Sequence, residues 1–215
     1  MRVLRITGNV FIVLGATLLF FVLYELVGTS MITDRHQSAL AEQFDLTLDR
    51  PPLPQPTTDP VVASPSPEPK PRAHGAGPEP IARIIIPSIG VRNIVVEGVT
   101  LNDLAWGPGH YKGTSDIGQA GVTAIAGHRT GWGSPFIDLD KVERGDEIIF
   151  QTPEATYTYE MTRRTVVDAG DVKVLLGDPK SNSTHKLTLT TCTPKYTSLR
   201  RLIVWGDLVD VKPRK

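Results

Sequence analysis

The stretch KLTLTTCTPKYTSLRRLIVWGDLV, residues 186–209, decides the fold of this chain. Its two ends, 186–192 and 201–209, are runs rich in β-branched and aliphatic residues, and Pro, Lys, Ser and Thr lie between them. Such runs separated by turn signals are typical of β-strands. Alternation along the first strand places both of its leucines on one face and Cys192 on the other, polar face.

Cys192 is the single cysteine of the chain. The chain therefore has no internal disulfide, and zinc sites that need two or more thiolates are excluded. A cysteine kept for packing would more naturally stand among the leucines, because a free thiol behaves as a small buried hydrophobe. Its polar position leaves a reactive and a structural role open, and the neighbouring residues decide between them.

A thiol nucleophile needs a base or cation beside it and a donor for the charge that develops on the attacked carbonyl. Of the five histidines, His128 is favoured because it ends a predicted strand and enters the turn RTGWGSP, whereas His110 lies in the loop GPGHYKG. For the cation, Arg200 and Arg201 begin the last strand. Alternation does not choose between them, because both faces of that strand are apolar.

Further strand-like runs precede this stretch, in a region of about 130 residues, the common size of one domain. We predict strands at 82–86, 93–99, 121–128, 146–152 and 156–167. Short helical turns fit between them at 135–140 and 172–176. The region is therefore expected to be mainly β, a closed or nearly closed barrel with short helices.

Residues 51–80 have a different character, because they hold 11 of the 18 prolines, with Ser, Thr, Glu and Gly between them. No core can form from this composition, and extended polyproline II would let it reach about 90 Å at ~3.1 Å per residue. A stalk that lifts the barrel into a thick layer such as a cell wall is one interpretation. An SH3-type ligand or a plain disordered tether remains the alternative.

Residues 6–24 carry no charge and are rich in Val, Leu and Phe. A helix of this length spans the ~30 Å hydrocarbon layer of a bilayer, so we predict one transmembrane helix. Arg2 and Arg5 precede it and Glu25 follows, which places the amino terminus in the cytoplasm and the rest outside. A cleaved signal peptide is the alternative, but its small-residue site, 39–41, lies far from the apolar run.

The whole chain carries 23 Lys and Arg against 23 Asp and Glu, and 40% of its residues are hydrophobic. It is therefore neither a nucleic-acid binder by bulk charge nor an acidic disordered tail. The predicted division is a cytoplasmic amino terminus and membrane anchor at 1–28, a juxtamembrane and Pro-rich disordered linker at 29–80, and the barrel domain at 81–215.

The motif TLTTC, with Arg201 nine residues beyond it and AGHR upstream, resembles the sortases, the membrane-anchored cysteine transpeptidases of Gram-positive bacteria. The resemblance covers residues 81–211 and includes the anchor and linker arrangement. The stretches GPGHY and TLTTCTPKYTSLRRLIVWG are most similar to class E, the housekeeping sortases of actinobacteria. The resemblance implies the closed β-barrel of that family.

The resemblance also implies roles for individual residues. Cys192 would be the nucleophile and His128 its partner. Arg201 would stabilise the substrate carbonyl and the oxyanion, with Arg200 as the fallback for this role.

The substrate groove is expected to contain further residues near this site. Tyr111 matches the tyrosine that class E enzymes place beside the second residue of the sorting signal, which favours LAxTG over LPxTG. His110 would shape the groove, and Thr190 and Thr191 complete the set of candidate substrate-binding residues. The family usually has proline after the tyrosine, where Lys112 stands in this chain.

The implied reaction cleaves a C-terminal sorting signal between Thr and Gly and joins the Thr carbonyl to a peptidoglycan amine through a thioacyl enzyme. The partners are then secreted proteins that carry the signal, the peptidoglycan precursor and the membrane, and nucleic acid is not among them. No metal or organic cofactor is needed for this chemistry. The sequence contains no compact carboxylate cluster of the EF-hand kind.

Two other functions stay open from the residues alone. An L,D-transpeptidase that cross-links peptidoglycan would also be an exported Cys/His enzyme, but its serine-glycine-cysteine context is missing around Cys192. A membrane-tethered, non-catalytic binding module of the cell wall would use the barrel as a scaffold, and its cysteine would be buried and unreactive.

Overall fold

The computed structural model describes residues 2–24, 28–48 and 77–214, and eight strands of this part form one closed barrel. Around the barrel the strands follow the order β1-β2-β3-β4-β7-β8-β6-β5. The strands are β1 (Pro80–Ile86), β2 (Val91–Glu97), β3 (Gly109–His110), β4 (Gly121–Ala126), β5 (Glu147–Gln151), β6 (Ala155–Asp168), β7 (His185–Thr193) and β8 (Arg200–Pro213). The prediction of a mainly β, closed barrel is confirmed.

The strand pairing brings the carboxyl ends of β4 and β7 to the same edge of the sheet, because these two strands run parallel. β2 and β3 also run parallel, whereas the other neighbouring pairs are antiparallel. β7 pairs with the first part of β8, from Lys186 opposite Asp207 to Thr193 opposite Arg200, with Cys192 directly opposite Arg201. The two sequence runs that opened the argument are thus adjacent strands.

The core lies inside the barrel and is built from alternate residues of the strands. Leu187 and Leu189 of β7 are fully buried there, together with Val204 of β8 and the rings of Phe150 and Tyr159. Burying one such side chain contributes about 1.5–3 kcal/mol. The leucine face predicted for β7 is therefore the inner face of the barrel.

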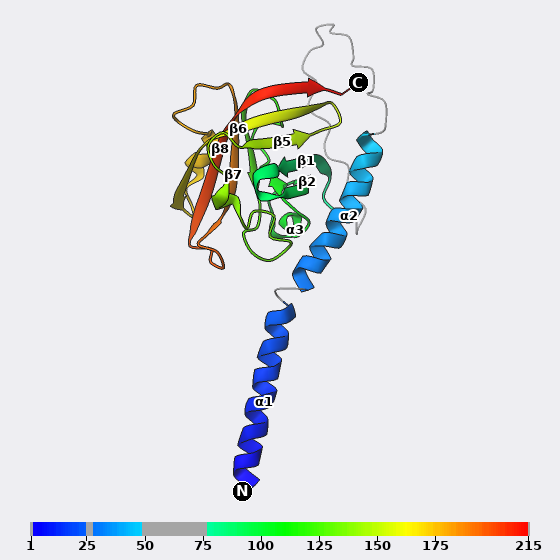
Figure 1. Cartoon of the computed structure of the whole chain (residues 1–215), viewed down its shortest axis with the longest axis vertical. Helices are drawn as coiled ribbons and strands as arrows, with labels where there is room; N and C mark the ends of the chain where they lie inside the picture. Colours follow the sequence, from blue (N-terminus) through cyan, green and yellow to red (C-terminus); the bar gives the residue numbers. More distant parts are fainter. Residues whose placement is uncertain (1, 25–27, 49–76, 215) are drawn as a thin grey trace.

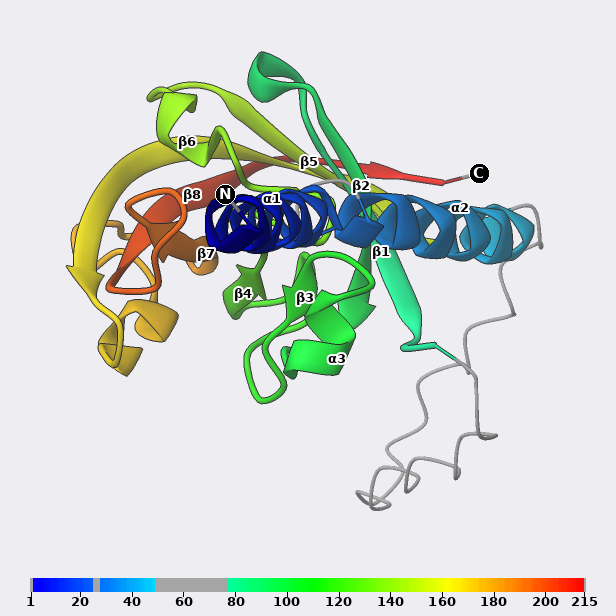
Figure 2. The ribbon, with the colours of Figure 1, turned by 90° about the horizontal axis from the view of Figure 1, so that it is seen from below.

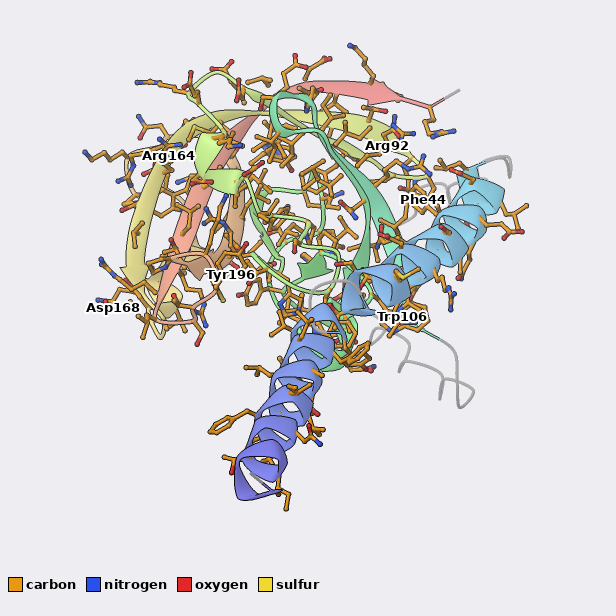
Figure 3. The ribbon with its side chains drawn as sticks, turned by 60° about the horizontal axis from the view of Figure 1, so that its bottom comes forward. Phe44, Arg92, Trp106, Arg164, Asp168 and Tyr196 are labelled. Carbon is orange, nitrogen blue, oxygen red and sulfur yellow. The ribbon has the colours of Figure 1, made fainter. Side chains whose placement is uncertain are left out.

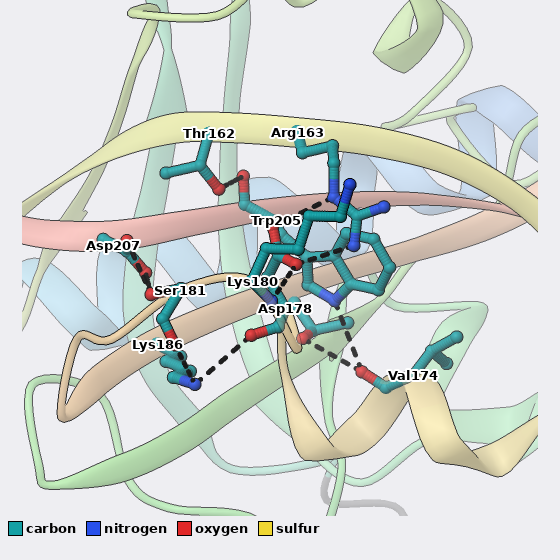
Figure 4. Close-up of polar contacts among 10 residues, drawn as sticks. Thr162, Arg163, Val174, Asp178, Lys180, Ser181, Lys186, Trp205 and Asp207 are labelled. Carbon is teal, nitrogen blue, oxygen red and sulfur yellow. Dashed lines mark hydrogen bonds and ion pairs between the residues drawn. The ribbon is translucent and has the colours of Figure 1, made fainter.

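A second apolar cluster covers the outer face of β8. The 3-10 helix η4 (Val172–Leu176) places Val174 against Ile203 and Trp205. Polar contacts hold the chain after η4 in place, as Figure 4 shows: Arg163 of β6 donates two hydrogen bonds to the Asp178 carboxylate, at 3.1 and 2.6 Å, while its guanidinium lies over the Trp205 ring. η4 spans the helical turn expected at 172–176.

The other short helices fall between strands. They are η2 (Pro87–Ile89), α3 (Leu101–Leu104) and η3 (Leu139–Lys141). The helical turn expected at 135–140 appears as η3, displaced toward the carboxyl side, and α3 was not expected. A capping box between Thr100 and Asp103 accounts for α3, because each side chain accepts a hydrogen bond from the backbone of the other.

Two longer helices precede the barrel, α1 (Arg2–Leu23) and α2 (Thr29–Leu48). α1 extends away from the barrel, and α2 lies along its side across β1 and β2 (Figure 1, Figure 2). Within the described residues, no helix combines the length and the apolar character of a membrane span.

The docking of α2 differs from the expectation of a juxtamembrane and disordered linker over 29–80. Leu40 and Phe44, one helical turn apart, are buried against Ile94 and Val96 of β2. Figure 3 shows Phe44 on this side of the barrel. The rest of the helix is mostly polar, so two apolar residues gave no periodic signal in the sequence. The prediction for residues 51–76 lies outside the described residues.

The side chain of Gln37 completes this contact by bonding the backbone of β2. Its Nε2 donates to the carbonyls of Ile94 and Trp106, at 3.0 and 2.7 Å, and its Oε1 accepts from the Ile94 N–H at 2.6 Å. β3 pairs with β2 only at Val96 and Glu97. The amide of Gln37 therefore satisfies β2 backbone groups that no strand reaches.

Candidate active site

Cys192 lies near the end of β7 on the outer face of the barrel, as alternation from the buried leucines requires. It is partly exposed, and it is a free cysteine. Thr188 and Thr190 share this outer face, whereas Thr191 points inward. The predicted polar face of the cysteine strand is therefore the outside of the barrel.

A pocket of about 320 Å³ opens at this point, and both Cys192 and His128 line it. The other lining residues come from the turn after His128 and from the loop between β7 and β8; they are Arg129, Thr130, Tyr196, Thr197 and Ser198. Figure 3 shows Tyr196 across the barrel from Phe44 of α2. Two residues that are 64 positions apart in the chain thus border one space because β4 and β7 are parallel neighbours.

His128 follows directly after β4, and two contacts fix its backbone. The Gly127 N–H donates to the carbonyl of Thr190 at 3.1 Å, and the carbonyl of His128 accepts from the Phe136 N–H, also at 3.1 Å. A Cβ on Gly127 would lie 2.5 Å from the Phe136 ring, so only glycine allows this approach. Burial lowers the pKa of His128 from its ordinary value of 6.5.

The two candidate arginines occupy different environments. Arg201 is directly opposite Cys192, and directly opposed residues of antiparallel strands share a face. Its Nη1 donates to the carbonyls of Ser198 and Arg200, at 3.0 and 3.1 Å. Arg200 instead lies opposite Thr193 and Asp168 and forms an ion pair with Asp168 at 3.6 Å. The register therefore brings Arg201 to the cysteine face and not Arg200.

Arg129 is a pocket residue that sequence reasoning missed. It is only 3% exposed, and its Nε donates to the Ile137 carbonyl at 2.7 Å while its Nη2 pairs with Asp140 at 2.8 Å. Its Nη1 also donates to the Cys192 carbonyl at 3.4 Å. The motif AGHR contains it, but its partners come from distant segments. Arg129 ties the turn after His128 to η3 and to the nucleophile strand.

Tyr111 reaches the same outer face from the segment that follows β3. Its N–H donates to the Ala124 carbonyl at 2.9 Å, and its hydroxyl shares a hydrogen bond with Thr190 Oγ1 at 3.2 Å. Thr190 stands two residues before Cys192. Tyr111 and Thr190, both predicted to bind substrate, therefore contact each other on the face of β7 that carries Cys192.

His110 and Thr191 occupy inner positions that do not border the cysteine pocket. His110 is 3% exposed and lines a different pocket, together with Glu97 and Asp116. Successive residues of an extended chain point to opposite sides, so when Tyr111 faces outward His110 faces inward. Thr191 donates to the Gly127 carbonyl at 2.7 Å and thereby joins β7 to β4. His110 therefore does not line the cysteine pocket itself, and its role in shaping the groove stays a prediction.

Two further histidines, His36 and His185, are not among the residues that line the cysteine pocket. His36 stacks on Trp106 on the α2 side, and His185 bonds Thr184 at the start of β7. Within residues 2–24, 28–48 and 77–214, no cluster of His, Cys, Asp and Glu has the arrangement of a metal site. Cys192 and His128 line one surface pocket, and Arg201 lies opposite Cys192 without lining it. A thiol, an imidazole and a guanidinium so placed can supply a nucleophile, a proton carrier and an anion stabiliser, which is the set of groups that cysteine acyl transfer uses.

Comparison with known proteins agrees with this chemistry. The family described as the Sortase domain matches residues 84–209. Sortase SrtE2 of Streptomyces coelicolor is 33% identical over 97% of this chain and 83% of its own length. Sortase SrtE1 of the same organism is 31% identical over 98% of this chain and 58% of its own length.

Solved structures give the same result. The crystal structure of sortase E1 from Streptomyces coelicolor, with a tripeptide in its active site, is 34% identical at a TM-score of 0.60, over 63% of this chain and 91% of that one. Sortase E from Streptomyces avermitilis is 36% identical at a TM-score of 0.58, over 64% of this chain and 93% of that one. The chain belongs to the sortase family, whose members are cysteine transpeptidases, and it is similar to sortases of class E.

Proposed function

We propose that this chain is a membrane-anchored sortase that cleaves a C-terminal sorting signal of the LAxTG or LPxTG type between Thr and Gly and transfers the Thr carbonyl to a peptidoglycan amine. Members of the family act on proteins that carry sorting signals and on peptidoglycan precursors. The observation that carries the proposal is the shared pocket of Cys192 and His128, with Arg201 opposite the cysteine.

In the first half-reaction, Cys192 Sγ attacks the Thr carbonyl carbon of the signal. The C–N bond to Gly then breaks, the Gly amine leaves with a proton from the His128 imidazolium, and the Thr acyl group remains on sulfur as a thioester. The pocket is open to solvent between the β7–β8 loop and the turn after His128, so an extended peptide can reach the thiol from outside the barrel.

Arg201 supports this step by stabilising the oxygen of the attacked carbonyl. A guanidinium stays charged and offers a fixed fork of donors, which suits the negative charge that appears in the transition state. Its cross-strand position opposite Cys192 favours it over Arg200, whose side chain pairs with Asp168. To act on the substrate, Arg201 would exchange its carbonyl partners in the β7–β8 loop for the substrate oxygen.

In the second half-reaction, the amine of a peptidoglycan precursor attacks the thioester carbon. Neutral His128 takes the proton from the amine, the C–S bond breaks, and Cys192 is regenerated. Burial favours the neutral imidazole, as the direction of the His128 pKa indicates. The same side chain therefore delivers a proton in one half and accepts one in the other.

Tyr111 is the proposed contact for the second residue of the signal. Its hydroxyl is held by Thr190 on the face that carries Cys192. A ring fixed at this place narrows the space beside the bound peptide, which fits a preference for the small alanine of LAxTG over the proline of LPxTG. Lys112, where relatives have proline, follows it in this chain.

The proposed location is the outer side of the cell membrane, with residues 1–28 as anchor, 29–80 as juxtamembrane segment and Pro-rich linker, and 81–215 as the catalytic domain. The uncharged run 6–24 and the arginines that precede it support an amino terminus in the cytoplasm. The described side chains of the run's apolar residues, from Ile6 to Tyr24, are exposed. Burial in a bilayer would cover them.

A peptide assay tests the proposed function. Fluorogenic peptides with LAxTG and LPxTG are given to the wild type and to Cys192→Ala, with and without a peptide amine. We expect the wild type to cleave the LAxTG peptide faster, to form the ligated product when the amine is present, and to lose both activities in Cys192→Ala. Cleavage of neither peptide by the wild type would contradict the proposal.

A further inference from the structure

His110 is a buried ionisable side chain that the proposed mechanism does not use. It stands on β3 opposite Ile125 of β4 and is 3% exposed. It lines a pocket of about 490 Å³ that is separate from the one lined by Cys192. The next residue along the chain is Tyr111, whose side chain lies on the outer face of the barrel.

The partners of the two ring nitrogens determine the charge of His110. Nδ1 lies 2.9 Å from Oε2 of Glu97, and Nε2 lies 3.1 Å from the Ser115 carbonyl oxygen. A carboxylate and a backbone carbonyl only accept hydrogen bonds, so each of these contacts is satisfied when the nitrogen donates. A neutral imidazole carries a proton on one nitrogen only and would leave one of the two acceptors without a donor. The imidazolium form therefore satisfies both contacts at once.

The charges around the ring are consistent with this form. Burial works against the charge of the imidazole, but the hydrogen bond and negative charge of Glu97, with the Ser115 carbonyl and Asp116, raise the pKa of His110 above 6.5. Asp116 comes from the loop before β4. The other titratable side chains of the pocket are Glu79, Glu154 and Tyr157.

Protonated His110 decides how the hydroxyl of Thr114 is oriented. Thr114 Oγ1 lies 3.0 Å from His110 Nε2 and accepts a hydrogen bond from the Ala124 N–H at 3.3 Å. With both of these groups donating to it, the single hydroxyl proton is free for the Tyr111 carbonyl, to which it donates at 2.8 Å. If Nε2 lost its proton, it would become an acceptor that competes for the same hydroxyl proton.

The Tyr111 carbonyl is thus held next to the side chain that reaches the nucleophile strand. The Thr114 N–H donates to the same carbonyl at 3.1 Å, and the Tyr111 N–H donates to Ala124. At its other end the Tyr111 hydroxyl meets Thr190, two residues before Cys192. A continuous series of contacts therefore joins the Glu97 carboxylate inside to the tyrosine outside.

We propose that Glu97, His110 and Thr114 form a positioning network, in which a protonated His110 fixes the hydroxyl of Thr114 and thereby holds Tyr111 in place at the rim of the cysteine groove. The network acts on how well the peptide binds and not on the chemistry at the thiol. Its kinetic readout rests on the proposed function, because it uses the sorting-signal peptide.

The first experiment reads the protonation of His110 directly. Nitrogen-15 NMR of histidine-labelled, full-length protein in detergent, with His110→Gln used for assignment, is recorded at pH 7.5. We expect both ring nitrogens of His110 to bear protons. A neutral ring at this pH would overturn the proposal, and the result does not depend on enzymatic activity.

The second experiment separates binding from chemistry with variants of Thr114. Thr114→Val removes the hydroxyl but keeps the shape of the side chain, and we expect KM for the LAxTG peptide to rise about five-fold with kcat nearly unchanged. Thr114→Ser restores the hydroxyl and should restore KM. His185→Gln, a histidine outside the network, is the control and should keep the wild-type KM. An unchanged KM in Thr114→Val would overturn the proposal.

The third experiment uses pH. In Glu97→Gln the hydrogen bond to a carboxylate and the negative charge that raise the pKa of His110 are lost, so a smaller fraction of His110 is protonated at pH 7.5 than at pH 5.5. The KM ratio of variant to wild type, taken at equal pH, should be about five at pH 7.5 and fall toward one at pH 5.5. A ratio independent of pH would contradict the role of the charge.

Failure of the proposed function has a different signature. If the wild type cleaves no sorting-signal peptide, the proposed function is wrong, but the NMR spectrum still tests whether the network exists. In that case the ring resonances of Tyr111 should shift in Thr114→Val and return in Thr114→Ser. Identical Tyr111 resonances in all three proteins would overturn the positioning role.

Discussion

Cys192, His128 and Arg201 reach one face of the barrel by three different routes. Cys192 is placed by the period of β7, His128 by the parallel pairing of β4 with β7, and Arg201 by the register of β8. Each of these routes is backbone geometry, so the site is held by the sheet and not by a flexible loop. The loop between β7 and β8 adds only the outer wall of the pocket.

The register predicts unequal effects for the two arginines. Arg201→Ala removes the donor opposite Cys192 and should lower kcat/KM for the LAxTG peptide by about 100-fold, the usual effect of losing one oxyanion donor. Arg200→Ala loses an exposed ion pair and should change kcat/KM by less than about three-fold. Steady-state kinetics of both variants measure this. Equal losses in the two variants would contradict the assignment.

The two histidines near β3 and β4 are predicted to titrate on opposite sides of pH 6.5. Burial lowers the pKa of His128, whereas Glu97 raises that of His110 in spite of its burial. On going from pH 8 to pH 5, His110 should therefore be protonated first and His128 second. An NMR titration of the ring protons in Cys192→Ala gives the order, and the reverse order would contradict both environments.

At the scale of the elements, the docking of α2 against the barrel is the feature that the sequence pattern did not predict. Its buried contacts depend on Leu40 and Phe44, and its polar contacts on Thr33 and Gln37. Thr33 donates to the Ala105 carbonyl, and Thr29 accepts from the Trp132 N–H at 3.4 Å, in the turn that follows His128. The helix therefore contacts the turn that follows His128 and borders the cysteine pocket.

Removing the amide of Gln37 should loosen this helix. Gln37→Ala leaves the Ile94 N–H and two carbonyls without their partner, which costs about 1–3 kcal/mol in the free energy of unfolding. Gln43→Ala, an exposed position on the same helix, is the matched control and should cost less than about 0.5 kcal/mol. Urea unfolding compares the two. An equal effect of both substitutions would show that Gln37 is not needed for docking.

The bond between Arg163 and Asp178 makes a pH-dependent prediction for the segment after η4. The hydrogen bonds from Arg163 lower the pKa of the Asp178 carboxyl from 3.8, against the opposing effect of burial. A depressed pKa contributes stability that is complete above the unfolded-state value and is lost as the pH falls through the folded-state value. Asp178→Asn should therefore be less stable than the wild type at pH 7, by about 1–3 kcal/mol, and the difference should shrink below pH 3.8. A difference that persists unchanged at pH 2.5 would contradict this cause.

Local sequence patterns predicted seven of the eight strands described, because each of the seven is a run of five or more residues rich in β-branched, aliphatic or aromatic side chains. β3 could not be predicted, since two residues, Gly109 and His110, carry no period. The faces of β7 followed from alternation, so the exposure of Cys192 could be foreseen. The choice of Arg201 over Arg200 could not, because both faces of β8 are apolar and only the register with β7 distinguishes them.

Tertiary contacts account for the residues that sequence reasoning missed or misplaced. Arg129 gains its role from Ile137, Asp140 and Cys192, and none of these lies in its own motif. His110 faces inward because its neighbour Tyr111 faces outward. Which of the two residues faces inward depends on the pairing of β3 with β4, which the sequence does not show. A basic residue after His128 was the only available signal for Arg129.

At the scale of the molecule, α1 and α2 place the barrel at one end of an elongated chain (Figure 1). The turn after His128 borders the pocket of Cys192, and the start of α2 contacts this turn through Thr29. With residues 1–28 as the proposed anchor, the active site would stay accessible to proteins leaving the cell and to the growing wall. The Pro-rich linker would belong to the same extracytoplasmic side.

Charges in the proposed anchor should release the enzyme from membranes. Leu14→Lys combined with Phe21→Lys puts two ammonium groups in the apolar run, at a cost of about 2.5–3.5 kcal/mol each at the bilayer centre. After carbonate extraction we expect the wild type in the membrane fraction and the variant in the supernatant. Val172→Lys with Leu176→Lys, at exposed positions of η4, is the control. If carbonate released all of the wild-type protein into the supernatant, this result would contradict the proposed membrane anchor.

The central claim is that Cys192 carries the acyl group between the two substrates. Its most direct measurement is the intact mass of the enzyme, mixed with an LAxTG peptide and quenched in acid, followed by tandem mass spectrometry. We predict an adduct that corresponds to the peptide up to and including Thr, located on Cys192, removed by hydroxylamine and absent in Cys192→Ala. Peptide cleavage that continues in Cys192→Ala, or an acyl group on any other residue, would contradict the account.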